Sequence, residues 1–280
     1  MNRIAIQQIV EEIKDLPTLP AVVMEILNQI DSDQVDTHEL AQKVTHDIAL
    51  TAKTLRYANS AYYSTLVKVT TIQQAIGLLG LVTVRQLIVT AALTGCFPEN
   101  NCAGFSHKQF WEHSNTVAIV AKILARRLHV SQDVAFTAGL LHDIGTLVLV
   151  TYHGRAYEAV LAAQREQALT QLQAEHQVLG IDHAEVGTAL ARQWNFSEQM
   201  INAISGHHQP ETPGLGFLAT IVHVANGIAH VLHLNHTPDH STPEITALSW
   251  QHLGLDQDVL DQVLLEASAE FLKLQQQVLI

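Results

Sequence analysis

Several features that mark other classes of protein are scarce in this 280-residue sequence. It has only two cysteines, Cys96 and Cys102, and no CxxC pair, so no disulfide framework is expected and a reducing compartment fits. Lys and Arg number 15 against 27 Asp and Glu, which gives a net charge of −12. Because nucleic-acid grooves are lined by basic residues, this balance argues against a nucleic-acid partner.

Long uninterrupted hydrophobic runs are also missing. The tracts LIVTAALTGCF and FLATIVHVANGIAHVL are too short, or too rich in polar residues, to span a bilayer. Near the N-terminus, Glu11, Glu12 and Asp15 interrupt the apolar core that a signal peptide needs. We therefore expect a cytoplasmic protein without a membrane partner.

Helical periodicity runs along almost the whole chain, and no stretch alternates convincingly as a β-strand does. With 48% hydrophobic and 15% charged residues, the composition is that of a globular protein with one large or two modest domains. The segment CFPENNCAGFS breaks the helical pattern with Pro, Asn and Gly. We predict an all-α fold of two packed helical subdomains, residues 1–100 and residues 101–280, the second with a C-terminal helical extension.

Polar residues with capping chemistry mark several of the predicted helix starts. Thr37, Asp47 and Thr71 are candidate N-caps because their side-chain oxygens can accept a hydrogen bond from the first turn. Asp182, followed three residues later by Glu185, forms a capping-box pattern. These residues predict where several helices begin, and Asp182 marks the start of the helix that carries His183.

Two metal-binding side chains, His142 and Asp143, lie side by side at the end of the apolar segment GLLHDIG. We expect Gly145 to stop this helix. The C-terminal end of a helix disfavours an anion unless a cation compensates it, so the Asp143 carboxylate indicates a positively charged partner. A single histidine on an apolar face is more simply a hydrogen-bonded core residue, and only a group of such residues indicates a shared site.

Such a group exists at the ends and inner faces of the second-half helices: His113, His142, Asp143, His183, His207, His208 and Asn226. Imidazole and carboxylate together suit Fe, Mn, Zn or Ni, and a bridging carboxylate can hold two such ions. We predict a shared site for one or two divalent ions. Asn226 also recurs at helical spacing with His223, His230 and His233. A second metal site is one interpretation of that row, and we prefer a solvent-facing or interface strip.

The order of these motifs resembles a known family. FWEHSNTVA, AGLLHDIGTLVL, DHAEVGTALARQW and AISGHH are similar to metal-dependent phosphohydrolases of the HD superfamily, especially its HD-GYP branch. With LPTLP and ALTAKTLRYANSAYYS before them, residues 16–211 resemble an HDOD domain, the HD-related output domain of bacterial signalling proteins. The resemblance implies that the second subdomain is an HD-like helical bundle.

The resemblance also implies a role for each candidate. His113 takes the place of the first metal ligand, and His142 with Asp143 forms the namesake pair, in which Asp143 is the bridging carboxylate. His183 matches the histidine of the HD-GYP segment HPxxG, which reads HAEVG here. The paired histidines that follow in the family are matched by His207 and His208. The last ligand of the family is an Asp, and Asn226 stands in its place.

Three departures from the HD-GYP pattern concern catalysis. Asn226 is neutral, Thr146 replaces the Lys that follows HDxG and brings no charge, and HHQPETPGLG continues without a GYP segment. Relative to the HD-GYP pattern, this sequence therefore lacks features that support catalysis, whereas it keeps most of the metal ligands. We therefore predict a bacterial signal-transduction module with a degenerate HD-type metal site and no efficient hydrolysis. It would act on a signalling partner in trans or by self-association, and a small phosphate-containing molecule is a candidate ligand.

The alternative is a metal-dependent phosphohydrolase that cleaves a phosphodiester in a nucleotide or cyclic dinucleotide. In that case the predicted ligands would hold one or two metals, and Asp143 and Thr146 would be the catalytic residues. The number of candidate ligands that persist favours this alternative, and the lost catalytic parts favour the signalling module.

Overall fold

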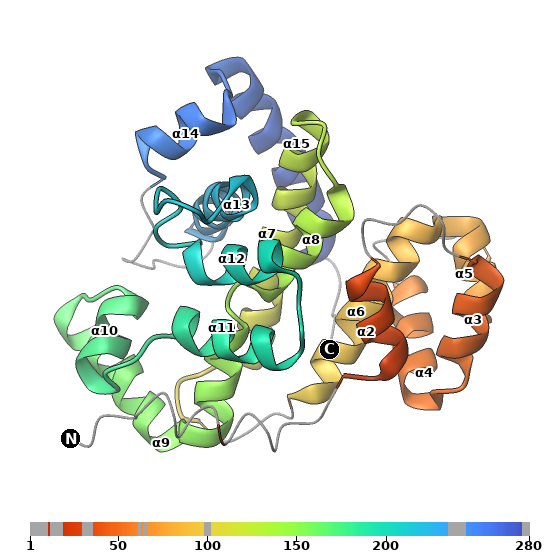
Figure 1. Cartoon of the computed structure of the whole chain (residues 1–280), viewed down its shortest axis with the longest axis horizontal. Coiled ribbons are helices and arrows are strands. Elements are labelled where there is room, and N and C mark those ends of the chain that lie inside the picture. Colours follow the sequence, from red (N-terminus) through yellow and green to blue (C-terminus); the bar gives the residue numbers. More distant parts are fainter. Residues whose placement is uncertain are drawn as a thin grey trace. The chain divides into compact units, whose positions relative to one another are not determined.

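The computed structural model describes residues 11, 19–29, 36–60, 63, 67–97, 102–234 and 245–275, and every regular element among them is an α-helix. This confirms the all-α prediction. The chain divides into two compact units (Figure 1). The N-terminal unit contains Pro17–Cys96 together with residues 268–275, and the C-terminal unit contains Phe97–Ala267.

The helices of the N-terminal unit are α2 (Ala21–Asn28), α3 (Thr37–Thr45), α4 (Ile48–Ala58), α5 (Ile72–Leu79) and α6 (Leu81–Cys96). Asp47 and Thr71 cap α4 and α5 as predicted, each accepting a hydrogen bond from a backbone N–H of the first turn. The prediction for Thr37 was wrong. Asp36 is the N-cap of α3, because its carboxylate reaches two backbone N–H groups of the first turn and carries the charge that a helix N-terminus favours.

The core of the N-terminal unit is α6. Its residues from Val84 to Leu93 are all buried, and it packs against α2, α4 and α5. A helix that is apolar on nearly every side must be covered on every side, which explains why three helices surround it.

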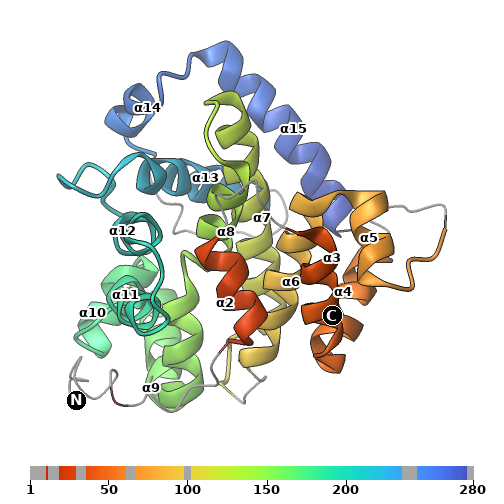
Figure 2. The same cartoon turned by 45° about the vertical axis from the view of Figure 1, so that its right-hand side comes forward.

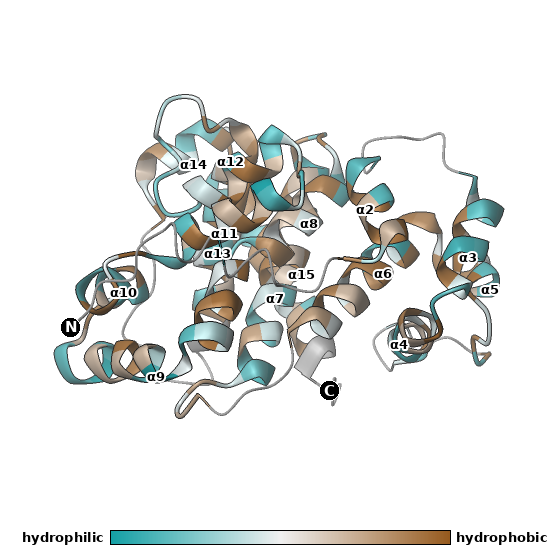
Figure 3. Cartoon of the chain, turned by 60° about the horizontal axis from the view of Figure 1, so that its bottom comes forward, coloured by the Kyte–Doolittle hydropathy of each residue, from teal (hydrophilic) through white to brown (hydrophobic). Residues whose placement is uncertain are grey.

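The helices of the C-terminal unit are α7 (His107–Arg127), α8 (Gln132–Leu141), α9 (Ile144–Gln167), α10 (Gln171–Val178), α11 (His183–Gln193), α12 (Glu198–Gly206), α13 (Phe217–Leu234) and α14 (Ala247–Leu253). Helix α15 (Gln257–Gln275) belongs to this unit up to Ala267, and its residues 268–275 belong to the N-terminal unit. Helix α7 packs along α8 and α13, and α9 packs along α10 and α11 (Figures 1 and 2). Helix α12 lies against α11 and α13. Most of these helices carry both hydrophilic and hydrophobic residues (Figure 3).

The stretch Gln132–Gln167 is long and apolar enough to cross a membrane by length and composition. Its most apolar part is nevertheless 89% buried within the fold. It is also not one continuous helix, because α8 ends at Leu141, α9 begins at Ile144, and α9 is kinked at His153. These are properties of core helices rather than of a helix that faces lipid.

Candidate metal centre

The break between α8 and α9 places His142 and Asp143 at a helix junction. The prediction that Gly145 stops the helix was wrong, because α8 already ends at Leu141 and Gly145 is the second residue of α9. The role of Gly145 is steric. A Cβ atom built there would lie 2.0 Å from the carbonyl oxygen of His183 and 2.5 Å from the backbone nitrogen of Gly187. Glycine therefore lets the start of α9 touch α11, which brings Asp143 next to His183.

Asp143 lies at the start of a helix, whereas the sequence analysis expected it at the end of one. Helix α9 begins directly after Asp143, so the carboxylate lies at a helix N-terminus, where the dipole favours an anion. It makes no capping hydrogen bond and faces imidazoles instead. Oδ2 lies 3.2 Å from Nε2 of His142. Burial alone would raise the pKa of Asp143, but the imidazoles of His142 and His183 outweigh it and hold that pKa well below its usual range.

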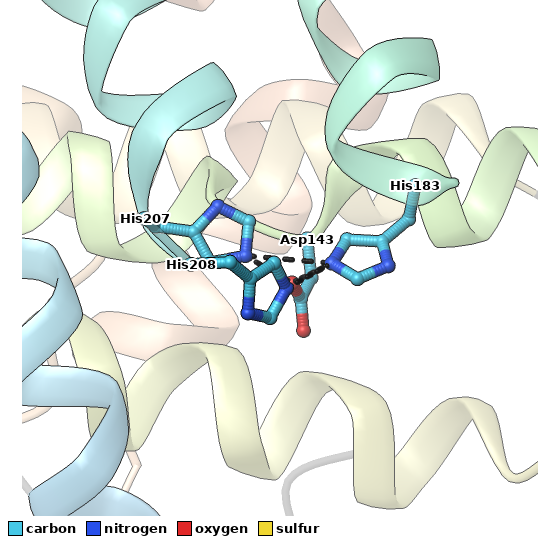
Figure 4. A group of neighbouring side chains, drawn as sticks. All are labelled: Asp143, His183, His207 and His208. Carbon is cyan, nitrogen blue, oxygen red and sulfur yellow. Dashed lines mark hydrogen bonds and ion pairs between the residues drawn. The ribbon is translucent and has the colours of Figure 1, made fainter. Parts of the chain in front are cut away.

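Four side chains converge in the first group of donors: Asp143, His183, His207 and His208 (Figure 4). His183 is the first residue of α11, and the two other histidines follow the end of α12. Nε2 of His183 and Nε2 of His207 are 3.4 Å apart, and each lies 3.3 Å from Oδ1 of Asp143. A tetrahedral ion with bonds of about 2.0–2.1 Å has ligand atoms about 3.3 Å apart. The triangle formed by these three atoms therefore fits one face of such a coordination sphere.

The second group of donors is His113, His142 and Asp143. His113 comes from α7, and its ring centroid lies 5.4 Å from that of His142. Helices α7 and α8 approach closely because Gly139 of α8 faces Ala118 of α7. A Cβ atom added at Gly139 would lie 2.9 Å from Cα of Ala118. Since Asp143 belongs to both groups, its carboxylate is placed to bridge two ions, as the resemblance implies.

Hydrogen bonds to backbone or carboxylate oxygens orient the histidines. Nδ1–H of His142 and of His207 each donates to the carbonyl three residues earlier, at 2.8 Å. Nδ1–H of His183 donates to Oε2 of Glu175 at 2.6 Å. In each ring this leaves Nε2 directed at the site, which is the arrangement that metal-binding histidines use.

Glu175 is a member of the site that the sequence reasoning missed. It is fully buried in α10, and its carboxylate accepts hydrogen bonds from the hydroxyl of Tyr157 at 2.9 Å and from Nε2 of Gln171 at 3.0 Å. Its oxygens and that of Asp143 raise the pKa of His183 well above its usual range, although burial alone would lower it. The spacing of Glu175, one helical turn from the apolar residues Val178 and Leu179, places it near the apolar face of α10, but this pattern does not link it to His183.

Helix α13 buries the polar residues Thr220, His223 and Asn226. The preferred interpretation of the polar row was a solvent-facing or interface strip, and its solvent-facing form is wrong for His223 and Asn226, which are 4% and 3% exposed. Nδ1–H of His223 donates to the carbonyl of His207 at 2.7 Å, so it supports the paired histidines. The ring of His230 lies 4.7 Å from that of His113. The side chain of His233 lies outside the described part of the chain.

A pocket of about 750 Å³ opens beside His208. Its walls come from α10, α11, α12 and the segment that follows α12. They include exposed Arg192, Gln193 and Gln209, together with apolar Leu172 and Leu215. Since His208 belongs both to the first donor group and to the pocket wall, a ligand in the pocket would lie next to that group.

The donors present fit a divalent metal. Among the described residues, Nε2 of His142 and Oδ1 of Asp143 are buried and make no hydrogen bond, and the same is true of Oδ1 of Asn226. Buried polar atoms that make no hydrogen bond are unfavourable, and a cation would satisfy the first two, which have only imidazole–carboxylate contacts of 3.2 and 3.3 Å. Mixed imidazole and carboxylate ligands suit first-row divalent ions. An ion held there would lower the pKa of a bound water and polarise a phosphoryl oxygen.

Comparison with protein families and solved structures gives matches over most of the chain. The family model of the HDOD domain matches residues 16–210. An HDOD domain protein of unknown function from Geobacter sulfurreducens has 28% identity and a TM-score of 0.77, with 95% of this chain and 97% of that protein covered. A proposed phosphohydrolase from Shewanella amazonensis also has 28% identity, with a TM-score of 0.75 and coverage of 96% and 97%.

Curated relatives are longer than this chain. An uncharacterized protein of Treponema pallidum is 28% identical over 217 residues, which is 73% of this chain and 40% of that protein. Ribonuclease Y of Pelobacter propionicus is 30% identical over 122 residues, which is 44% of this chain and 18% of that enzyme. The chain thus spans less than half the length of these two relatives.

Proposed function

Because this chain belongs to the HDOD family, we propose that it is a bacterial signalling module whose HD-type site binds a divalent metal without efficient hydrolysis. One observation carries the proposal. Three donor atoms keep distances suited to an ion, with edges of 3.3 and 3.4 Å, while Thr146 and Asn226 stand where the resemblance expects a Lys that helps catalysis and an Asp that binds metal. Metal binding and turnover are therefore separated in this chain.

The first altered position is Thr146, where the resembling enzymes place a Lys. Its side chain is 3% exposed, and its hydroxyl oxygen accepts a hydrogen bond from Nε2 of Gln171 at 3.0 Å. A buried hydroxyl engaged in this way offers no positive charge to a phosphate. Transition-state stabilisation of a phosphoryl group depends largely on such charges, so its loss supports poor hydrolysis.

The second altered position is Asn226, which stands where the resemblance expects an Asp ligand. A neutral amide contributes no negative charge, so an ion near it is held more weakly than by a carboxylate. We predict that Asn226→Asp tightens the binding of a divalent ion about tenfold or more, measured by isothermal titration calorimetry with Mn²⁺. An unchanged or weaker affinity would contradict the placement of Asn226 beside the metal.

We further propose that the module signals through a protein partner in trans or through self-association, and that a small phosphate-containing ligand occupies the pocket beside His208. Arg192 supports this ligand class, because it is exposed on the pocket wall and a guanidinium binds phosphate through paired hydrogen bonds. The ligand would then lie between Arg192 and a metal held by His208.

Elemental mass spectrometry tests the metal directly. Untagged protein, purified without added metal, is compared with Asp143→Ala and with His46→Ala, which changes an exposed histidine that belongs to no cluster of possible metal ligands. We expect about one or two equivalents of Fe, Mn, Zn or Ni in the wild type and in His46→Ala, and a loss in Asp143→Ala with the helical circular dichroism kept. Absence of metal from the folded wild-type protein would refute the proposal.

The second candidate function is a metal-dependent phosphohydrolase. The ligand geometry around Asp143 favours it, as does the similarity to ribonuclease Y over 122 residues. The metal-loaded protein is assayed with bis(p-nitrophenyl) phosphate and with cyclic dinucleotides. Turnover that disappears in Asp143→Ala would replace the signalling proposal with this one, and turnover equal in both proteins would indicate a contaminant.

A further inference from the structure

The two donor groups of the candidate metal centre differ in how they are built. We name them the His183 half (Asp143, His183, His207 and His208) and the His113 half (His113, His142 and Asp143). We propose that one ion binds tightly in the His183 half, that the buried carboxylate of Glu175 makes this half the tighter one, and that the His113 half takes a second ion only weakly. This inference rests on the proposed metal binding.

The number and spacing of donors favour the His183 half. It offers three imidazoles and a carboxylate, enough for a tetrahedral ion, and three of its donor atoms already form a triangle with edges of 3.3, 3.3 and 3.4 Å. The His113 half offers two imidazoles and shares the same carboxylate. The residue that would complete it by resemblance, Asn226, is a neutral amide and brings no negative charge.

The hydrogen-bond partners of the imidazoles differ between the halves. His183 donates to the carboxylate of Glu175 at 2.6 Å, whereas His142 donates to a backbone carbonyl at 2.8 Å. A carboxylate partner fixes the ring orientation and raises the basicity of the ligand nitrogen more than a neutral carbonyl does. Removing such a partner typically lowers metal affinity about 10–100-fold, so Glu175 alone can separate the two halves by that factor.

Charge balance points the same way. A divalent ion in the His183 half would be matched by two carboxylates, Asp143 as a ligand and Glu175 behind His183. An ion in the His113 half would have only the shared Asp143. In a buried site, where charges are weakly screened, the missing carboxylate is a substantial loss of attraction.

Glu175 is held rigidly in this position. Besides the ring of His183, it accepts the backbone N–H of that residue at 2.9 Å and bonds to Tyr157 and Gln171. Burying a carboxylate is unfavourable unless hydrogen bonds and a positive charge compensate it. The ion-pair contact with the ring of His183 at 2.6 Å contributes to this compensation, and a cation held at Nε2 of the same ring would supply a further positive charge.

Calorimetric titration of the metal-free full-length chain with Zn²⁺ tests the proposal. For the wild type we expect one equivalent to bind tightly and a second to bind at least about tenfold more weakly. In Glu175→Gln the tight step should weaken about 10–100-fold, while the weak step changes less than about threefold. Tyr157→Phe is the matched control, since it removes one hydrogen bond but keeps the carboxylate, and its tight step should weaken less than that of Glu175→Gln.

If Glu175 acts by positioning His183, its substitution should weaken the tight Zn²⁺-binding step much more than the weak step. If Glu175 only stabilises the fold, both steps should weaken. If Glu175→Gln does not fold, His183→Ala and His113→Ala decide: the first should remove the tight step and the second only the weak one. Equal affinities of the two steps, or an unchanged tight step in folded Glu175→Gln, would overturn this inference while leaving metal binding intact. A wild type that binds no Zn²⁺ would overturn the proposed function itself.

Discussion

Replacing Gly145 by Ala tests whether the contact between α9 and α11 assembles the metal centre. The new methyl carbon would lie 2.0 Å from the carbonyl oxygen of His183, whereas close carbon–oxygen contacts are about 3.3 Å. Because the atoms it meets belong to the backbone, no side chain can rotate away, and the two helices must separate by about 1 Å. We expect destabilisation near the upper end of the range for overpacked cores, about 3 kcal/mol.

Two measurements follow from this displacement. A loss of about 3 kcal/mol in a unit of this size lowers the thermal midpoint by roughly 6–12 °C, measured by circular dichroism. Metal sites need their ligands within about 0.2 Å of the ideal distances, so a shift of Asp143 away from His183 by about 1 Å should also weaken Zn²⁺ binding more than a hundredfold.

Gly154→Ala is the matched control, because it adds the same methyl group to the same helix. Its nearest new neighbour is Cβ of Cys102 at 3.8 Å, which is an ordinary van der Waals contact. We expect its stability to change by less than about 1 kcal/mol and its metal affinity to stay as in the wild type. If Gly145→Ala melts within about 2 °C of Gly154→Ala and binds Zn²⁺ equally well, the close contact is not what brings the ligands together.

Three further predictions concern caps, thiols and metal removal. Asp182→Ala removes the capping box of α11 and the 2.9 Å contact with His176, so urea denaturation should show a loss of about 1–2 kcal/mol, and no loss would contradict the capping role. Burial raises the pKa of Cys96, so little thiolate forms at pH 8 and iodoacetamide should label the native protein far more slowly than the urea-unfolded protein. At a hundredfold excess of free metal over its Kd, chelation should cost about 2.7 kcal/mol of stability in the wild type and nothing in Asp143→Ala.

The local features of the fold could be predicted from the sequence because their causes are local. Helical periodicity needs only neighbouring residues, and the caps at Asp47, Thr71 and Asp182 need only an oxygen near the first turn. Gly145 was misinterpreted for the same reason. A glycine after a polar pair locally predicts a helix end, and its true constraint comes from His183, 38 positions later in the chain.

Part of the candidate site could also be predicted from the sequence, and part of it could not. The sequence analysis selected six residues that the structure brings into two adjoining donor groups: His113, His142, Asp143, His183, His207 and His208. Their roles as metal ligands remain a prediction. The sequence analysis did not select Glu175. The segment QLQAEHQV is rich in polar residues and looks exposed, and the sequence shows no partner for an acidic residue within it. Only the fold places Glu175 against His183, and only then does its burial become informative.

A metal centre without turnover can still carry information, because of the elements that it joins. Its ligands come from the ends of α8, α11 and α12 and from α7, which are distant in sequence and held together by few covalent constraints. Binding an ion would stabilise only the arrangement in which these ends converge. The same α11 and α12 line the pocket beside His208, so occupancy of the metal centre and of the pocket would influence each other through shared residues. Slow or absent hydrolysis would then favour signalling, since a ligand that is not consumed keeps the module in one state for as long as it stays bound.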